Sequence, residues 1–253
     1  MNCKEIENIL EFIKFQKSTL KKYYSFIRSK MKSDYKKAAI FVYWLNDYIN
    51  YIKSESSFKP SLNITYKRGQ IIFVNFGFRI GRELGGNHYA IVLDTKNSKN
   101  GYLLTVVPLK SKKSTQSKYA SIYHVSLGDC VKNLLVQKAL HVIGENAKTL
   151  SEITPQICND GQELNPETIN KLGQIKRTNR MAREILEYAE KLKDESIADV
   201  GQITTISKQR INHPCKSKDI LTNVIIPKEL MTHIENKIKK LYISDTVEND
   251  VKY

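Results

Sequence analysis

Residues 68–113, RGQIIFVNFGFRIGRELGGNHYAIVLDTKNSKNGYLLTVVPLKSKK, decide the fold of this chain. Three short runs within them are rich in β-branched and aromatic residues and are bounded by Gly, Asn or Lys: Gln70–Phe76, Tyr89–Leu93 and Tyr102–Leu109. These runs predict three strands in a meander. The segment GFRIGRELGG between the first two carries four glycines and predicts an irregular loop.

This glycine-containing loop is not a dinucleotide-binding fingerprint, because its glycine spacing is wrong and a strand follows it instead of a helix. It carries Arg79, Arg82 and Glu83. One interpretation is a cover over a functional site, and the other is a long surface hairpin loop.

The positive charge of the chain is concentrated around this stretch. The formal net charge is +15, and residues 61–120 carry ten basic and two acidic side chains. Such a field favours a polyanionic partner, and aromatic side chains can stack on the bases of a single-stranded nucleic acid. Four aromatic residues are candidates for stacking: Phe76, Phe78, Tyr89 and Tyr102. The alternative is a solvated, lysine-rich surface without a specific partner.

Two ordered groups of motifs resemble PemK/MazF-type toxins of toxin–antitoxin pairs. Members of that family read RGDI, a strand, G-x-E-x-x-G, an R-P pair before an apolar strand, and V-P-[ILC]-T-[ST], with Q-I-R-T-I further downstream. The matching segments are RGQI (68–71), GRELGG (81–86), HYAIVL (88–93), VPLKS (107–111) and QITTISKQRI (202–211).

The resemblance implies an α+β fold built on a small, SH3-like antiparallel β-barrel of the PemK/MazF/CcdB type. Helical periodicity in residues 1–57 predicts an N-terminal helical extension, assigned to residues 1–60. The barrel domain then spans residues 61–253 and is interrupted at about 128–196 by helices that a compact barrel toxin lacks.

Outside the meander, the sequence predicts further elements for the same domain. Residues 121–127 and 197–206 are expected to form strands, and residues 208–218 a basic turn. Helical spacing of apolar residues predicts helices over 167–193 and 227–241.

Family members cut single-stranded RNA without a metal, through attack of the neighbouring 2′-hydroxyl on the scissile phosphate. The resemblance assigns this chemistry to the Arg of the R-P pair and the Thr of the V-P-x-T motif, with the loop Glu close by. Here His88 replaces that Arg, and Lys110, followed by Ser111, replaces that Thr. Histidine can transfer protons near neutral pH, lysine can hold a phosphate, and serine can donate a hydrogen bond. The alternative is a module that binds RNA without cutting it.

The candidate catalytic residues are therefore His88, Lys110, Ser111 and Glu83. Glu83 either orients His88 or pairs with a loop arginine. The candidate substrate contacts are Arg79, Arg82, Lys112, Lys113, Gln202, Thr205 and Lys208.

The resemblance also implies the partners: single-stranded RNA, a cognate antitoxin protein and a second copy of the chain in a homodimer. A gyrase-poisoning toxin on the same scaffold is a further alternative, as is DNA binding. Neither the scattered cysteines nor the histidines show ligand spacing, so no metal or cofactor is expected. No run reaches the length of a membrane span, which predicts a cytoplasmic protein.

Overall fold

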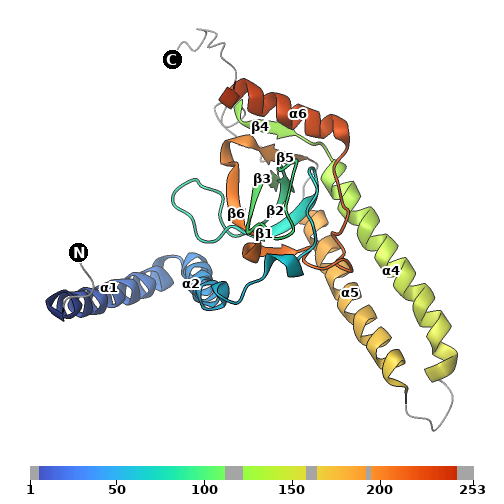
Figure 1. Cartoon of the computed structure of the whole chain (residues 1–253), viewed down its shortest axis with the longest axis horizontal. Coiled ribbons are helices and arrows are strands. Elements are labelled where there is room, and N and C mark those ends of the chain that lie inside the picture. The colour runs from blue at the N-terminus through green and yellow to red at the C-terminus, as the bar shows by residue number, and fades with distance from the viewer. Residues whose placement is uncertain (1–5, 112–121, 158–163, 192–194, 244–253) are drawn as a thin grey trace. The chain divides into compact units, whose positions relative to one another are not determined.

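The computed structural model describes residues 6–111, 122–157, 164–191 and 195–243 (Figure 1). The chain divides into two compact units, Met1–Ser57 and Phe58–Tyr253. In the described residues, no helix combines the length and the apolar content needed to cross a membrane.

The first unit is a pair of helices, α1 (Ile6–Ser33) and α2 (Tyr35–Glu55). Asp34 separates them and caps α2, since its side chain accepts a hydrogen bond from the backbone N–H of Lys37 at 3.0 Å. Phe41 packs against Tyr23 and Phe26 and joins the two helices.

The second unit is built on an antiparallel sheet with the strand order β4-β5-β3-β2-β1-β7, in which β6 also pairs with β3. The three strands of the predicted meander are present. Strands β1, β2 and β3 pair as neighbours and are followed along the chain by the others. The bounds are β1 Ile71–Asn75, β2 Asn87–Val92, β3 Leu103–Ser111, β4 His124–Ser126, β5 Ser196–Asp199, β6 Thr204–Ser207 and β7 Ile211–His213.

Strand β3 has two partners on the edge that faces away from β2. Its first half pairs with β6 and its last three residues pair with β5. Leu93 N–H donates to the carbonyl of Thr105, so the odd-numbered residues of β3 direct their backbone groups toward β2 and the even-numbered ones toward β5 and β6. Pro108 is even-numbered, so its backbone nitrogen faces β5 and β6, and as a proline it has no N–H to donate there. At this point along the edge, the 3₁₀ turn η2 (Val200–Gln202) separates β5 from β6.

Two sequence-based expectations for this region were wrong. The single strand expected over 197–206 is the β5–η2–β6 sequence, because the ladder cannot continue opposite Pro108. The basic turn expected over 208–218 contains β7, which pairs with β1. The mixed helical and antiparallel fold class is confirmed. The ladders among the described residues run from β4 to β7 without joining, so closure into an SH3-like barrel is not observed.

The two faces of the sheet bury different apolar clusters. Tyr89 and Ile91 of β2 belong to one cluster, together with residues of the helices α4, α5 and α6; we call this side the helical face. Ala90 and Val92 alternate to the other side and pack with Tyr66 and residues of β1, β3, β6 and β7; we call this side the inner face.

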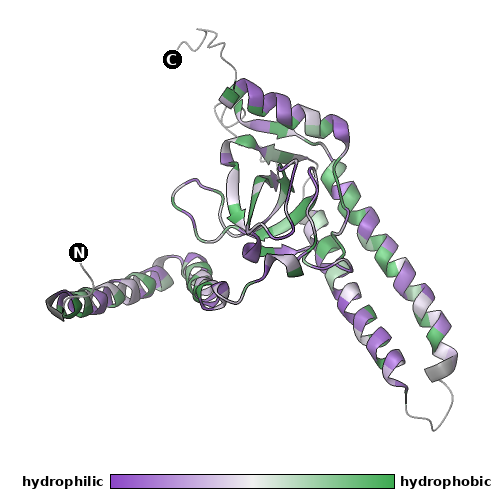
Figure 2. Ribbon diagram, viewed as in Figure 1, coloured by the Kyte–Doolittle hydropathy of each residue, from purple (hydrophilic) through white to green (hydrophobic). Residues whose placement is uncertain are grey.

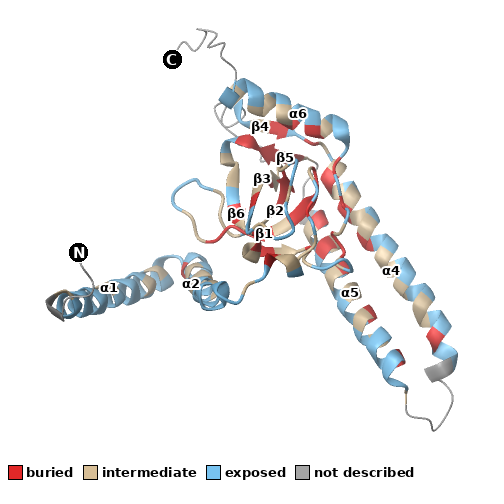
Figure 3. Cartoon of the chain, in the orientation of Figure 1, coloured by how far each residue is buried: buried red, intermediate tan, exposed pale blue. Residues whose placement is uncertain are grey.

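The helices of the second unit are α4 (Cys130–Ile157), α5 (Pro166–Lys191) and α6 (Lys228–Ile238), which continues as η4 (Lys239–Ile243). Helices α4 and α5 form a long hairpin (Figure 1). Apolar and polar residues alternate around each helix (Figure 2), and buried positions lie where helices meet the sheet or one another (Figure 3). The helices predicted from periodicity within 128–196 and at 227–241 are thus present.

Gly201 in η2 provides a test of how tightly the turn opposite Pro108 is packed. A Cβ at this position would lie 2.9 Å from Cγ and 3.0 Å from Cβ of Tyr123. We expect Gly201→Ala to lower the free energy of unfolding by about 1–3 kcal/mol, because the base of the tyrosine side chain cannot move aside without shifting β4.

Urea denaturation of the two proteins measures this effect. Gly144→Ala in α4 is the matched control: its Cβ meets no atom within 4 Å, and the substitution should stabilise by about 0.5–1 kcal/mol. Equal midpoints for wild type and Gly201→Ala would contradict the expected crowding.

Candidate active site

Strand alternation directs His88 and Lys110 to the inner face of the sheet, from the neighbouring strands β2 and β3. In the ladder of β2 and β3, Ala90 is opposite Pro108 and Ile91 is opposite Val107. The paired residues end at Ala90 and Pro108, and by alternation along each strand His88 and Lys110 point to the same face as Ala90. His88 also makes a hydrogen bond with the backbone of Leu109, the residue before Lys110. The two positions at which the sequence departs from the toxin motifs are therefore neighbours.

The imidazole of His88 is half-buried and lies against the backbone. Burial lowers its pKa, while hydrogen bonds with the backbone of Gly85 and Leu109 act in the opposite direction. At neutral pH the ring is therefore uncharged. A neutral imidazole has one N–H that can donate and one nitrogen that can accept a proton.

The ammonium group of Lys110 is held by a buried carboxylate. Lys110 Nζ lies 2.6 Å from Asp199 Oδ2, and the two side chains are 25% and 8% exposed. On the other side of this carboxylate, His124 Nε2 lies 3.7 Å from the same oxygen. Asp199 and His124 are directly paired across β4 and β5, so both point to the inner face. The three residues form a polar cluster that continues the row of His88 and Lys110 across the sheet.

Gln202 fastens the glycine-containing loop next to this cluster. Its Oε1 accepts the backbone N–H of Leu84 at 3.3 Å, and its Nε2 donates to the carbonyl of Arg82 at 3.4 Å. The amide of Gln202 is thus engaged with the loop. Gly85 allows the loop to close on itself, because a Cβ there would lie 2.7 Å from the carbonyl oxygen of Gly77.

Comparison with known families matches residues 67–152 to the family described as PemK-like, MazF-like toxin of type II toxin-antitoxin system. Residues 67–152 are therefore similar to PemK/MazF-type toxins. No curated protein sequence matches the chain. The resemblance seen in the motifs is thus confirmed for this segment. The matched segment contains His88 and Lys110 and extends into α4, where the sequence analysis had placed the start of an insertion.

Nothing in the sequence singles out Asp199 and His124, which lie next to Lys110 in the structure. His124 was assigned to a strand but has no ligand spacing to single it out, and Asp199 precedes the downstream motif. Only the pairing of β5 with β3 and β4 brings them to Lys110. No group of three or more His, Cys, Asp or Glu with metal-binding geometry is present among the described residues.

Of the other two predicted catalytic residues, one is in an ion pair and one points to the opposite face of the sheet. Glu83 pairs with Arg79 at 3.8 Å and its side chain is 55% exposed, so the loop ion pair is formed and is of the weak, solvated kind. Ser111 follows Lys110 in β3 and therefore alternates to the helical face, opposite Ser196.

The predicted substrate contacts are dispersed. Lys208 is 1% exposed and donates to the carbonyl of Ser98 at 2.7 Å, so it does not reach solvent. Thr205 is paired with Thr105 on the side of β6 opposite to the buried Ile206. Arg82 is exposed on the loop. Lys112 and Lys113 lie outside the described residues.

Two of the aromatic residues proposed for base stacking are not accessible. Phe76 is 2% exposed and Tyr89 is 4% exposed, whereas Tyr102 is 56% exposed. Phe76 packs in the inner-face cluster, and Tyr89 packs against Phe73 and Tyr188 at ring distances of 4.9 Å and 4.4 Å. The expectation of stacking at Phe76 and Tyr89 was therefore wrong, because both rings are used in the core.

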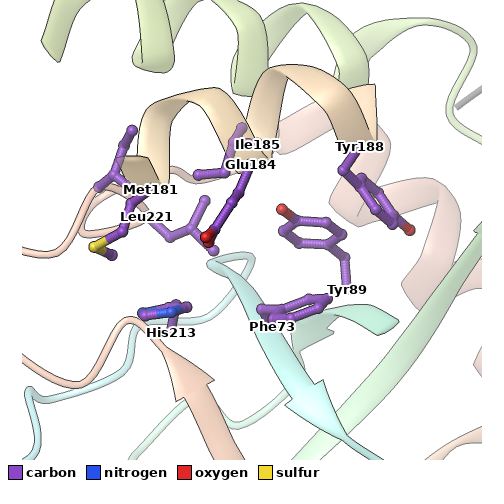
Figure 4. A pocket seen from close by; sticks show the side chains of 9 residues that line it. Phe73, Tyr89, Met181, Glu184, Ile185, Tyr188, His213 and Leu221 are labelled. Atoms are coloured by element: carbon purple, nitrogen blue, oxygen red, sulfur yellow. The ribbon is translucent and has the colours of Figure 1, made fainter. Parts of the chain in front are cut away.

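A separate pocket of about 210 Å³ lies on the helical face, between α5 and the sheet (Figure 4). Its wall is mainly aromatic and aliphatic, and its polar groups are Glu184 and His213. Figure 4 labels every lining residue except Ile220. None of the predicted site residues lines this pocket. Burial raises the pKa of Tyr188 to about 12 and that of Tyr89 as well, so both hydroxyls stay protonated.

The role of Gln202 can be tested by loop accessibility. We expect Gln202→Ala to speed tryptic cleavage at Arg79 and Arg82 by about fivefold to a hundredfold, because it removes two hydrogen bonds worth about 0.5–1.5 kcal/mol each from the closed loop. Gln137→Ala, an exposed position on α4, is the control and should cleave at the wild-type rate. Unchanged cleavage in Gln202→Ala would show that the loop is closed by other contacts.

The depressed pKa of His88 predicts a pH-dependent stability. The folded state favours the neutral ring, so its contribution is complete above the ordinary histidine pKa of about 6.5 and is lost as the pH falls through the lower pKa of the folded state. In urea unfolding at pH 7.5 and pH 5, His88→Gln should lose less stability than wild type. Equal losses in both proteins would contradict a desolvated His88.

Proposed function

We propose that this chain is a toxin of a type II toxin–antitoxin system that acts as a metal-independent endoribonuclease on single-stranded RNA. The observation that supports the proposal most is the adjacency of His88 and Lys110 on one sheet face, within the segment that matches the toxin family. The surrounding excess of basic side chains favours a polyanionic substrate.

In this proposal, His88 takes the proton from the 2′-hydroxyl next to the scissile bond. The 2′-oxygen then attacks phosphorus, the P–O5′ bond breaks, and the leaving oxygen takes a proton from the new imidazolium or from water. Lys110 holds the phosphate oxygens as their negative charge increases. The products are a 2′,3′-cyclic phosphate and a 5′-hydroxyl end. Every role in this scheme is filled by a side chain, so no metal is required.

The basic residues of the loop, the half-buried Arg79 and the exposed Arg82, are proposed to hold the RNA backbone, as are Lys112 and Lys113. Such contacts position the strand without reading its sequence. We further propose that the protein is silenced by an antitoxin protein, as the family description implies. We also propose that it works in the cytoplasm as a homodimer.

One observation favours a second candidate, an RNA-binding module without catalysis. Lys110 is already paired with Asp199, which offsets part of its charge toward a phosphate. If this pairing dominates, the protein binds RNA in a salt-dependent manner and leaves it intact.

Cleavage in the presence of excess chelator tests the proposal. Wild type should cut single-stranded RNA and leave 5′-hydroxyl ends, and His88→Ala and Lys110→Met should each slow cleavage by about 10²-fold or more, since each removes a group that acts in the transition state.

The controls are His233→Ala on α6 and Lys216→Met in the loop after β7, both exposed, which should cut at the wild-type rate. RNA that binds and stays intact would favour the second candidate, and RNA that neither binds nor breaks would contradict both.

A further inference from the structure

Asp199 is a charged group that the proposed chemistry does not use. It ends β5 on the inner face of the sheet and is 6% exposed. Tyr242 of η4 donates a hydrogen bond to the carbonyl of the next residue, Val200, at 3.3 Å. A carboxylate enclosed in this way has lost most of its hydration, so it depends on Lys110 and His124 for compensation.

Stability alone does not account for this pair. Removing a lysine and a carboxylate from water costs about as much free energy as their attraction returns, and apolar residues of similar volume often serve as well. The sheet offers such a solution next to it, since Ile197 lies opposite Lys110 and is 3% exposed. The Lys110–Asp199 pair is therefore expected to have a functional role, in the chemistry at the neighbouring His88.

The ion pair with Asp199 holds the ammonium group of Lys110 in place and uses only part of its N–H donors. An ammonium group has three N–H donors, and Asp199 accepts one at 2.6 Å. Because the Lys110 side chain is 25% exposed, the remaining donors can reach a phosphate oxygen. A free lysine side chain must lose about 2 kcal/mol of rotamer entropy to be held in one place, and here the carboxylate has already ordered it.

We propose that Asp199 is a positioning residue, which holds Lys110 beside His88 for the scissile phosphate, and that His124 supports the carboxylate from its other side. This inference rests on the proposed function. It assigns a mechanical role to a residue that lies outside the segment matched to the toxin family.

The proposal makes opposite predictions for binding and turnover. Asp199→Asn removes a negative charge close to the phosphate, which favours binding of the polyanion. The same change loosens Lys110 and so slows the chemical step. A residue with a merely structural role would instead lower stability and weaken binding and turnover together.

The experiment measures kcat and KM for single-stranded RNA in chelator with the full chain. Asp199→Asn should lower kcat about tenfold or more, with KM unchanged or lower. Asp199→Glu, which keeps the charge but displaces it by one methylene, should give an intermediate kcat, and it carries the test if Asp199→Asn does not fold. Glu235→Gln, which breaks a half-buried ion pair with Arg68 at 2.9 Å, is the control and should change neither value. An unchanged kcat in Asp199→Asn, or a rise in KM that matches the loss of kcat, would overturn the proposal.

A second readout separates this inference from the proposed function. Acetylation of Lys110 by an N-hydroxysuccinimide ester, followed by mass spectrometry, should be several-fold faster in Asp199→Asn than in wild type. A 2′-O-methyl RNA, which cannot be cleaved by 2′-hydroxyl attack, should protect Lys110 in wild type. If wild type does not cut RNA, the proposed function fails, and equal acetylation rates would then also overturn the positioning of Lys110 by Asp199.

Discussion

The missing N–H of Pro108 is the constraint on which the second unit depends. It lies on the edge of β3 that faces away from β2, so no single strand can pair along the whole of that edge. Two short strands, β5 and β6, pair with this edge in place of one long strand, and η2 joins them. Gly201 allows that turn to approach Tyr123 closely. Strand β3 thereby gains a second partner on this edge, at the point where an uninterrupted ladder is impossible.

The same interruption builds the candidate site. With β5 paired to the end of β3, Asp199 arrives beside Lys110, and Gln202 leaves η2 in reach of the glycine-containing loop. One short segment thus supplies both the carboxylate that holds the lysine and the amide that holds the loop. The inner face then presents a neutral imidazole and an ordered ammonium group side by side, which is the arrangement from which we argue RNA cleavage.

Much of the framework was predictable because it depends on local pattern. The meander of β1, β2 and β3, the cap at Asp34 and the helices α5 and α6 follow from alternation, periodicity and capping within short windows. The errors share one cause: they concern contacts between distant segments. Phe76 and Tyr89 are as aromatic as Tyr102, and only tertiary packing decides which of the three rings is exposed.

The sequence by itself determined the family segment, the basic character of its surroundings and the substitution of His88 and Lys110 at the two motif positions. The tertiary structure decided what those residues can do. It paired β2 with β3 so that His88 and Lys110 share a face, turned Ser111 to the other side, and buried Lys208. It also brought Asp199 and His124 to Lys110 from strands far away in the chain. The physical reason is that strand register sets the face and the neighbours of every side chain, and register is fixed by pairing between segments that no local window of sequence contains.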